Sequence, residues 1–212
     1  MIATKQVGIY VYQNFEPIDV WGFIQAFAIA RFAGQDYEEP GPYPFHITLI
    51  ANRLVPVHAY NGPAVAPDIT RADALRRPFD LLMVPGGFGT QAVLDDDTFT
   101  PWIKAMDAKV PLMTSVCTGA AMLAKAGLLD RKPAATNHGV FDWVASYGPL
   151  VQWDRVSRWV DAGKYVTSAG VSAGTDMAFY LVARLMGQAV ANRAAAMAEY
   201  HWQRDPSVQL PF

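Results

Sequence analysis

The chain has 212 residues, of which 52% are hydrophobic and 17% are charged, and its formal net charge is −2 at pH 7. This composition predicts one globular domain over residues 1–212 rather than a disordered chain, and the absence of a Lys/Arg cluster argues against nucleic-acid binding. A single cysteine excludes an internal disulfide framework, and with no leader and no apolar run of the ~20 residues that a membrane span needs, we expect a cytoplasmic protein without a membrane partner.

Strand and helix patterns alternate along the chain. In chain order, apolar runs predict strands at 7–12, 45–50, 80–85, 110–116, 134–138, 156–160 and 165–168, and helical spacing predicts helices at 18–32, 99–106, 120–128, 140–147, 176–186 and 190–200. Asn61–Gly62 predicts a hairpin turn, and Asp68 or Thr70 is placed to cap a short helical turn. This alternation is typical of an α/β fold, a doubly wound and mostly parallel sheet sandwiched by helices.

The first predicted helix carries Asp19 in its first turn. A carboxylate there complements the positive end of the helix dipole, so position alone gives Asp19 no catalytic role. Trp21 on the same helix is a candidate for a pocket wall, although aromatic residues on apolar helices usually belong to the core. The loop of residues 34–44 that follows the helix is long, and long loops are often functional.

A glycine-rich turn, Gly86–Gly87–Phe88–Gly89, follows the strand at 80–85. Glycines allow close approach of the backbone, so the turn predicts either a phosphate cradle or backbone amides that donate to a reacting oxygen. No Lys-Ser/Thr pair follows, which excludes a Walker loop. Phe88 is a second candidate for a pocket wall. We interpret the acidic run that ends at Thr98 as the cap of the next helix rather than as a metal site.

The apolar run at 110–116 ends at Cys117, and a helical pattern begins at Ala120. Strand, sharp turn and helix in this order resemble the nucleophile elbow of α/β hydrolases, although the literal motif of that elbow is absent. The amino end of the following helix favours a thiolate, so we expect a lowered pKa for Cys117 and a reactive thiol rather than a structural one.

Several of these features fall where predicted strands end, which is where sites lie in open α/β sheets. They include His138 after the strand at 134–138 and Gly170 in a second small-residue turn before the helix at 176–186. His138 is either a base for the cysteine or a histidine that contacts only backbone. The other three histidines lack ligand spacing, and we predict no metal site and no cofactor.

Six segments together are similar to the ThiJ/PfpI superfamily, which has a class I glutamine amidotransferase-like, flavodoxin-like fold. The similarity covers residues 7–212, and the segments are 8–12, 18–22, 84–89, 115–120, 135–138 and 167–176. Cys117 followed by Thr-Gly-Ala, an aspartate in the first helix and the ending Leu210–Pro211–Phe212 resemble the isonitrile hydratase branch. No helix-turn-helix module follows, which implies a protein that stands alone.

The resemblance implies roles for particular residues. Cys117 would be the nucleophile and Asp19 the carboxyl that hydrogen-bonds it, with the backbone amides of Gly87 and Thr118 facing the reacting centre. A small-molecule substrate would contact the remaining candidates, which are Trp21, Phe88, His138 and Gly170. The absence of a histidine after the cysteine argues against a peptidase, and the superfamily implies a homodimer.

The hydratase hypothesis is that the cysteine attacks an isonitrile carbon and that Asp19, protonated because it is buried, acts first as an acid and then activates water. Trp21, Phe23 and Gly139 depart from the branch pattern and would reshape the pocket. Two alternatives stay open. One is a glyoxalase-like or deglycase-like thiol enzyme with His138 as base, and the other is a non-enzymatic redox sensor whose thiol oxidises readily.

Overall fold

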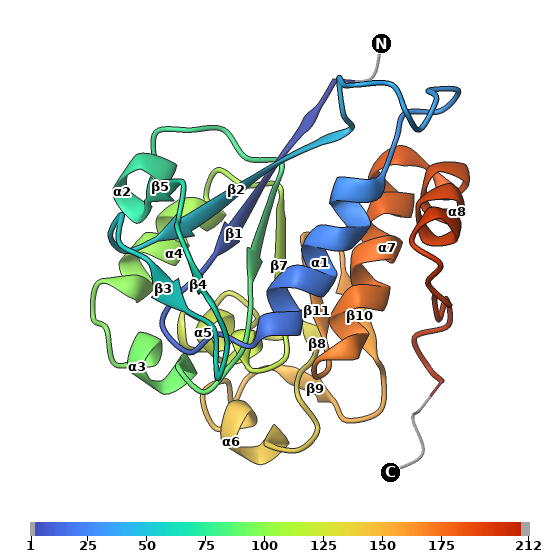
Figure 1. Ribbon diagram of the computed structural model, residues 1–212. Helices are drawn as coiled ribbons and strands as arrows, with labels where there is room; N and C mark the ends of the chain where they lie inside the picture. Colours follow the sequence, from blue (N-terminus) through green and yellow to red (C-terminus); the bar gives the residue numbers. More distant parts are fainter. Residues whose placement is uncertain (1–2, 209–212) are drawn as a thin grey trace.

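A seven-stranded sheet forms the centre of the computed structural model, which describes residues 3–208 (Figure 1). The strand order is β10-β11-β7-β6-β1-β2-β5, and every neighbouring pair is parallel except β10–β11. The strands are β1 Lys5–Tyr10, β2 Phe45–Ala51, β5 Ile69–Thr70, β6 Leu81–Val84, β7 Leu112–Val116, β10 Trp159–Ala162 and β11 Tyr165–Ser168. The predicted mostly parallel α/β sheet is confirmed, whereas the ending Leu210–Pro211–Phe212 lies outside the described residues.

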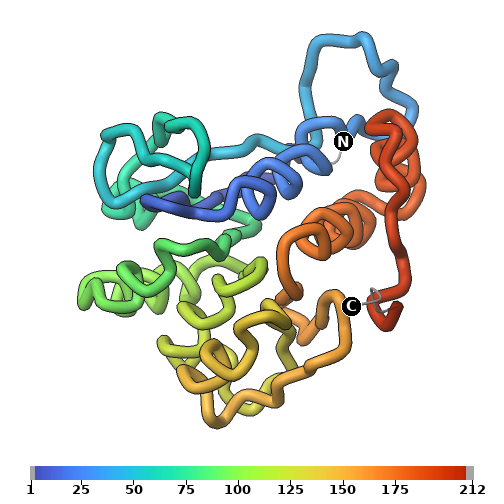
Figure 2. Tube along the Cα trace, turned by 60° about the horizontal axis from the view of Figure 1, so that its bottom comes forward, coloured from blue at the N-terminus to red at the C-terminus, as the bar shows by residue number. Residues whose placement is uncertain are grey.

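Helices cover the sheet in two groups (Figures 1 and 2). α1 packs along α7, which in turn packs on α8, while α3, α4 and α5 contact one another. Their bounds are α1 Pro17–Ile29, α2 Arg71–Ala74, α3 Thr90–Leu94, α4 Phe99–Asp107, α5 Gly119–Lys125, α6 Phe141–Ala145, α7 Ser172–Met186 and α8 Gln188–Met197. Residues 3–208 contain no helix that is both long and apolar enough to cross a bilayer.

Two small sheets lie outside the central one. β3 Val57–His58 and β4 Ala64–Val65 pair antiparallel around Asn61–Gly62, which confirms the predicted hairpin. β8 Pro133–Ala135 pairs with β9 Gln152–Asp154, a strand that the sequence patterns missed. The predicted strand at 134–138 is therefore too long, because the chain leaves the ladder at Thr136, whose hydroxyl donates to the Cys117 carbonyl at 2.9 Å.

A side-chain cap explains the start of α2, but not that of α4. The Thr70 side chain accepts from the Asp73 N–H, and the Asp73 carboxylate accepts from the Thr70 N–H; the two hydrogen bonds form a capping box for α2. The expected cap of α4 is wrong in detail, because Thr98 makes no side-chain bond to the helix. Its backbone N–H donates instead to Asp96, which also pairs with the buried Arg71.

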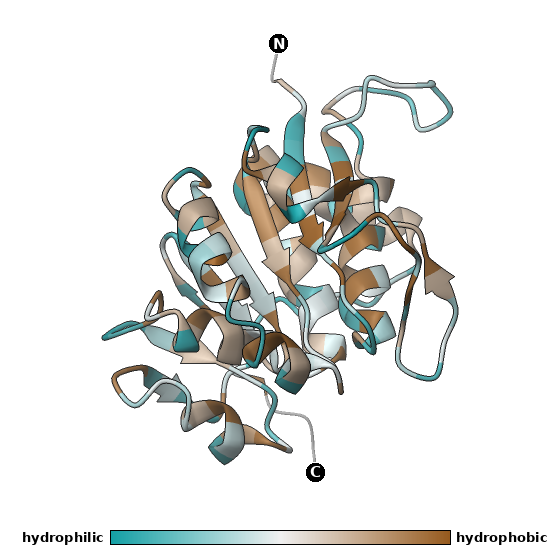
Figure 3. Cartoon of the chain, turned by 90° about the vertical axis from the view of Figure 1, so that its left-hand side faces the viewer, coloured by the Kyte–Doolittle hydropathy of each residue, from teal (hydrophilic) through white to brown (hydrophobic). Residues whose placement is uncertain are grey.

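The core lies between the sheet and its helices. Every residue of β6 and β7 is buried, and Figure 3 places apolar residues on the central strands and polar ones on the peripheral loops. The largest side chains that are almost fully buried are Phe15, Phe23, Phe27, Phe99, Phe179, Ile9, Ile50, Leu81, Leu82, Met83, Ile103 and Met106. Burial on both faces explains why β6 is a continuous apolar run without alternation, whereas β7 also buries the polar Thr114 and Ser115.

A buried ion pair fastens the segment after α8 to the start of α7. Asp176 pairs with Arg158, and its other oxygen accepts from the Tyr200 hydroxyl and the Gln203 N–H, each at 3.0 Å. Arg158 in turn donates its backbone N–H to the Pro206 carbonyl. Because both charges are buried, these hydrogen bonds are needed to offset the desolvation of the pair.

The close contact between α1 and α7 depends on Gly22, which has no side chain. A Cβ placed on Gly22 would lie 2.3 Å from the Thr175 hydroxyl oxygen and 3.3 Å from the Ile18 side chain. Since packed helices transmit such an overlap to their backbones, a larger residue at this position would move α1.

We expect Gly22→Ala to lower the free energy of unfolding by ~1–3 kcal/mol, the usual cost of overpacking. Urea unfolding followed by circular dichroism measures this change. The matched control is the double variant Gly22→Ala/Thr175→Ala, which removes the colliding oxygen and should regain much of the loss. Equal stability of wild type and Gly22→Ala would contradict the assigned packing.

Candidate active site

Cys117 lies at a sharp turn between β7 and α5. Its φ of +57° is in the left-handed region of backbone conformation that residues other than glycine rarely adopt. The turn is pressed against the end of β6, because a Cβ on Gly119 would lie 2.2 Å from the Val84 carbonyl oxygen and one on Gly86 2.6 Å from the Thr118 nitrogen. The geometry is that of the expected elbow, and the neighbouring glycines make it possible.

The cysteine lines a cavity of about 370 Å³. Cys117 itself is only 5% exposed, so the thiol is accessible from this cavity and otherwise enclosed. The other lining residues are Glu16, Gly87, Phe88, Thr90, Gln91, Thr118, Asn137, Val140, Trp143 and Val171. Most of the exposed wall is apolar, which suits an uncharged organic substrate.

Three donors surround the sulfur. The Asn137 side-chain amide donates to Cys117 Sγ at 3.0 Å. The backbone N–H groups of Thr118 and Val171 also favour the ionised form of the sulfur and lower the pKa of the thiol. Val171 occupies the position before α7 with a φ of +55°. The sulfur is therefore held by residues from three separate connections of the fold.

Asp19 is fully buried in the first turn of α1. Its Oδ2 accepts from the Gly86 N–H at 2.8 Å, and its Oδ1 is buried with no hydrogen-bond partner among the described residues. Burial raises the pKa of this carboxyl well above its usual range, which favours its protonated form. Gly86 bonds Asp19 on one side and touches Cys117 on the other, since its Cβ would lie 2.9 Å from the cysteine Cβ.

The expected ionised thiol is wrong for the free protein. Burial, followed by the nearby Asp19 charge, raises the pKa of Cys117 to about 12, even though the three donors act in the opposite direction. The physical reason is that the elbow is enclosed, so loss of hydration outweighs the amino end of α5. The resting site holds a thiol and a carboxylic acid, with no hydrogen bond between them among the described residues.

Gly87 and Thr118 are joined to each other. The Gly87 N–H donates to the Thr118 hydroxyl at 3.0 Å, the Thr118 and Thr90 hydroxyls are 2.8 Å apart, and the Thr90 hydroxyl donates to the Gly87 carbonyl. This ring fixes the glycine-rich turn. It also engages the Gly87 amide that was expected to face the reacting centre, whereas the Thr118 amide lowers the pKa of the Cys117 thiol.

The two aromatic candidates lie in different surroundings. Phe88 lines the cysteine cavity, is 71% exposed and stacks on Tyr60 with ring centroids 4.0 Å apart. Trp21 is half-exposed, packs edge-on against Phe15 and does not line that cavity. Phe23, the next departure from the branch pattern, is fully buried core.

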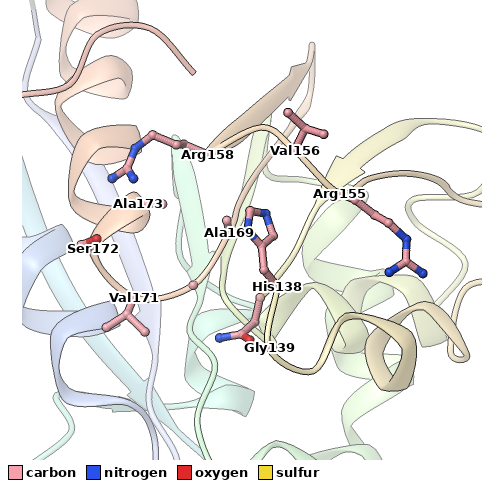
Figure 4. Close-up of a pocket in the computed structure, with 11 residues that line it drawn as sticks. His138, Gly139, Arg155, Val156, Arg158, Ala169, Val171, Ser172 and Ala173 are labelled. Carbon is pink, nitrogen blue, oxygen red and sulfur yellow. The ribbon is translucent and has the colours of Figure 1, made fainter. Parts of the chain in front are cut away.

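His138 and Gly170 belong to a second cavity of about 610 Å³ (Figure 4). Its wall also includes Gly139, Arg155, Val156, Arg158, Ala169, Ser172 and Ala173, and it shares only Asn137 and Val171 with the cysteine cavity. In Figure 4 the His138 ring lies between Arg155 and the start of α7, while the two guanidinium groups point away from it. The structure therefore does not place His138 as a base for the cysteine.

Sequence reasoning did not single out seven of the residues that line the cysteine cavity, which are Glu16, Thr90, Gln91, Asn137, Val140, Trp143 and Val171. Asn137 directly precedes His138, which was considered, and lies near the end of the predicted strand at 134–138 that the structure shortens to β8, so its place next to a strand end was the available signal. Burial raises the pKa of Glu16 modestly, which leaves a second carboxyl at the cavity wall. No group of His, Cys, Asp and Glu in residues 3–208 is arranged to hold a metal ion.

Comparisons with known proteins agree with this geometry. The profile of the DJ-1/PfpI family matches residues 5–184. The chain is similar to isonitrile hydratase of Pseudomonas putida, with 32% identity over 173 residues that cover 78% of this chain and 74% of that protein. It is also similar to the glutathione-independent glyoxalase DJR-1.2 of Caenorhabditis elegans, with 24% identity over 132 residues, 62% of this chain and 69% of the other.

A solved structure of a ThiJ/PfpI family protein from Pseudomonas syringae is similar over the whole fold. The TM-score is 0.82 at 28% identity, and the match covers 100% of this chain and 78% of that one. The connection from β7 through Cys117 to α5 lies within the residues matched to the family.

We expect Cys117 to react slowly with iodoacetamide at pH 7–8 and the rate to rise through pH 10 without a plateau, because only the thiolate attacks. Intact mass reports the reaction without ambiguity, since the chain has one cysteine. The control is the same protein in urea, whose exposed thiol should level off above its ordinary pKa of ~8.5. A native plateau by pH 8 would contradict the raised pKa.

We expect Asp19→Asn to stabilise the protein at pH 7 by at least ~1 kcal/mol, seen as a rise in Tm of about 2–4 °C. The pKa of Asp19 is higher in the folded than in the unfolded chain. The stability that this carboxyl contributes is therefore fully present below the pKa of the unfolded state and is lost as the pH rises through the pKa of the folded state. The stability gain should therefore disappear near pH 3. A variant less stable than wild type at pH 7 would contradict a buried, uncharged carboxyl.

Proposed function

This chain belongs to the DJ-1/PfpI family, and we propose that it is a thiol-dependent hydratase that converts an isonitrile into an N-substituted formamide. The observation that carries the proposal is the pairing of Cys117 with a buried, protonated Asp19 across Gly86, at the wall of an apolar cavity. The similarity to an isonitrile hydratase supports the same reaction.

The protonation state of the site suits the first step. In R–N≡C the terminal carbon must gain both a sulfur and a proton. The site supplies these as a thiol and a carboxylic acid: the carbon takes the Asp19 proton, the thiol proton passes to Asp19 as the C–S bond forms, and the product is the thioimidate R–N=CH–S–Cys117. The high pKa of Cys117 is therefore compatible with this reaction.

The second step is hydrolysis of the thioimidate. Water adds to the same carbon, its protons pass to the nitrogen and to the sulfur, and the C–S bond breaks to release R–NH–CHO and the thiol. Asp19 relays these protons: one carboxyl oxygen takes a proton from the attacking water while the other gives its proton to the nitrogen, so Asp19 is protonated before and after the step. The sum is one isonitrile and one water to one formamide.

The cavity wall favours an apolar substituent on the isonitrile nitrogen. Phe88, Val140 and Trp143 line it, and none of them carries a charge. An alkyl or aryl group on R–N≡C gains from burial in such a cavity and the molecule carries no net charge, whereas a charged substrate would need a buried partner. The expected substrates are therefore alkyl or aryl isonitriles.

The two alternatives have less support from the geometry. A glyoxalase-like reaction was assigned His138 as its base, and this residue lines the other cavity, although one similar protein bears a glyoxalase name. A redox sensor needs a thiol that ionises near neutral pH, and the pKa of Cys117 is about 12.

The test is incubation of the purified protein with a panel of alkyl and aryl isonitriles, with the formamide quantified by chromatography. Cys117→Ser and Cys117→Ala should abolish turnover, and Asp19→Asn should lower it by roughly 10²–10⁴-fold, the usual contribution of a positioned acid–base group. Asp97→Asn, a change at an exposed carboxyl, is the matched control and should keep full activity.

A parallel incubation with methylglyoxal, followed as lactate, separates the candidates. Formamide without lactate supports the hydratase. Lactate without formamide overturns it in favour of a glyoxalase-like enzyme. Formamide production that survives Cys117→Ala would exclude the thioimidate.

A further inference from the structure

The Asn137 side chain has one orientation. Its Oδ1 accepts from the Val140 N–H at 3.2 Å, so the amide must present its Nδ2 hydrogens on the opposite side, where Nδ2 lies 3.0 Å from Cys117 Sγ. A flipped amide would set two N–H groups against each other at Val140 and turn a carbonyl oxygen toward the sulfur. The bond at Val140 therefore determines the group that faces the thiol.

Gly170 provides the space that this amide occupies. A Cβ at position 170 would lie 2.5 Å from Asn137 Nδ2 and 3.2 Å from its Cγ. No atom of a folded protein tolerates that approach without a shift, and the amide nitrogen is the nearest group. Gly170 is not one of the residues that line the cysteine cavity, so its connection to the thiol passes through Asn137.

We propose that Asn137 is the positioning residue of this active site: its amide, held by the Val140 N–H and accommodated by Gly170, donates to the Cys117 sulfur and stabilises the thiolate as it forms. A hydrogen bond to an ionised acceptor is stronger than one to a neutral acceptor, so the amide favours the charged sulfur over the thiol. Its direction of effect on the pKa of Cys117 is downward.

The position of the amide gives it a second consequence within the proposed reaction. Asn137 is one of two residues that line both cavities, so its donor lies at their junction beside the sulfur. When sulfur becomes part of a thioimidate it is a poor acceptor, and the amide hydrogen is free for the substrate nitrogen. This part rests on the proposed function, whereas the donation to the sulfur does not.

The test is the rate of Cys117 alkylation by iodoacetamide between pH 7 and 10, read by intact mass. Asn137→Ala removes the donor and widens access to the sulfur. If Asn137 has only a structural role, alkylation should become faster. If the amide stabilises the thiolate, the rate should fall about three- to ten-fold at every pH. This range corresponds to a rise of ~1 unit in the thiol pKa, partly offset by the higher intrinsic nucleophilicity of the more basic sulfur. An unchanged or faster rate would overturn the proposal.

The isosteric change Asn137→Asp keeps the acceptor for Val140 and replaces the donor with a carboxylate. It should slow alkylation by more than Asn137→Ala, because a negative charge beside the sulfur opposes ionisation. A smaller effect than that of alanine would mean that shape, not donation, matters at this position. Asn192→Ala, at an asparagine on exposed α8, should leave the rate unchanged.

The role of Gly170 is read from a double-mutant cycle. Gly170→Ala alone should slow alkylation in the same direction, and Gly170→Ala/Asn137→Ala should be no slower than Asn137→Ala alone, because the collision has been removed. Additive effects would contradict a route through Asn137. Circular dichroism confirms that each variant is folded before it is assayed. Alkylation needs no substrate, so this result stands or falls independently of isonitrile turnover.

Discussion

The hydrogen bond from the Gly86 N–H to the buried Asp19 carboxyl connects the parts of the site that are far apart in sequence. It joins the first turn of α1 to the end of β6, and Gly86 is at the same time pressed against the elbow at Cys117. A side chain at position 86 would separate all three. The donor is an uncharged backbone amide, so this bond is not a salt bridge, and the position of the acid depends on the packing of the backbone at Gly86.

Enclosure also determines the chemistry available to the cysteine. Many reactive cysteines are ionised because a cation or a helix end stabilises the thiolate. Here burial dominates, and the donors around the sulfur only reduce its effect. A site that stores its protons on sulfur and carboxyl is suited to additions in which the substrate takes up a proton together with the nucleophile. Peptide hydrolysis and peroxide sensing instead need a cysteine that is already ionised.

Fold and family were predictable from the sequence, because periodic apolar runs, the elbow at Cys117 and six segments similar to the family are readable without coordinates. The position of Cys117 at the end of a strand followed from the same pattern, whereas Asp19 was assigned to the site only by the resemblance. The pKa of Cys117 and the cavity that contains His138 did not follow from the pattern, since both depend on how loops from distant strands pack. Asn137 illustrates the reason. Its neighbour His138 was the candidate because histidine is a common catalytic residue type. Only the path of the chain after β8 determines that Asn137 is the one that faces the sulfur. The homodimer stays a prediction.

The buried network at Asp176 has an effect beyond the stability of the ion pair. It ties Tyr200 and Gln203 to Asp176 on the second turn of α7, and the backbone N–H of Val171, the residue immediately before that helix, favours the ionised form of the sulfur. The residues after α8 thus support the candidate active site, although none of them lines its cavity. Removing them would release this support, so the geometry around Cys117 depends in part on a segment that is far from it in sequence.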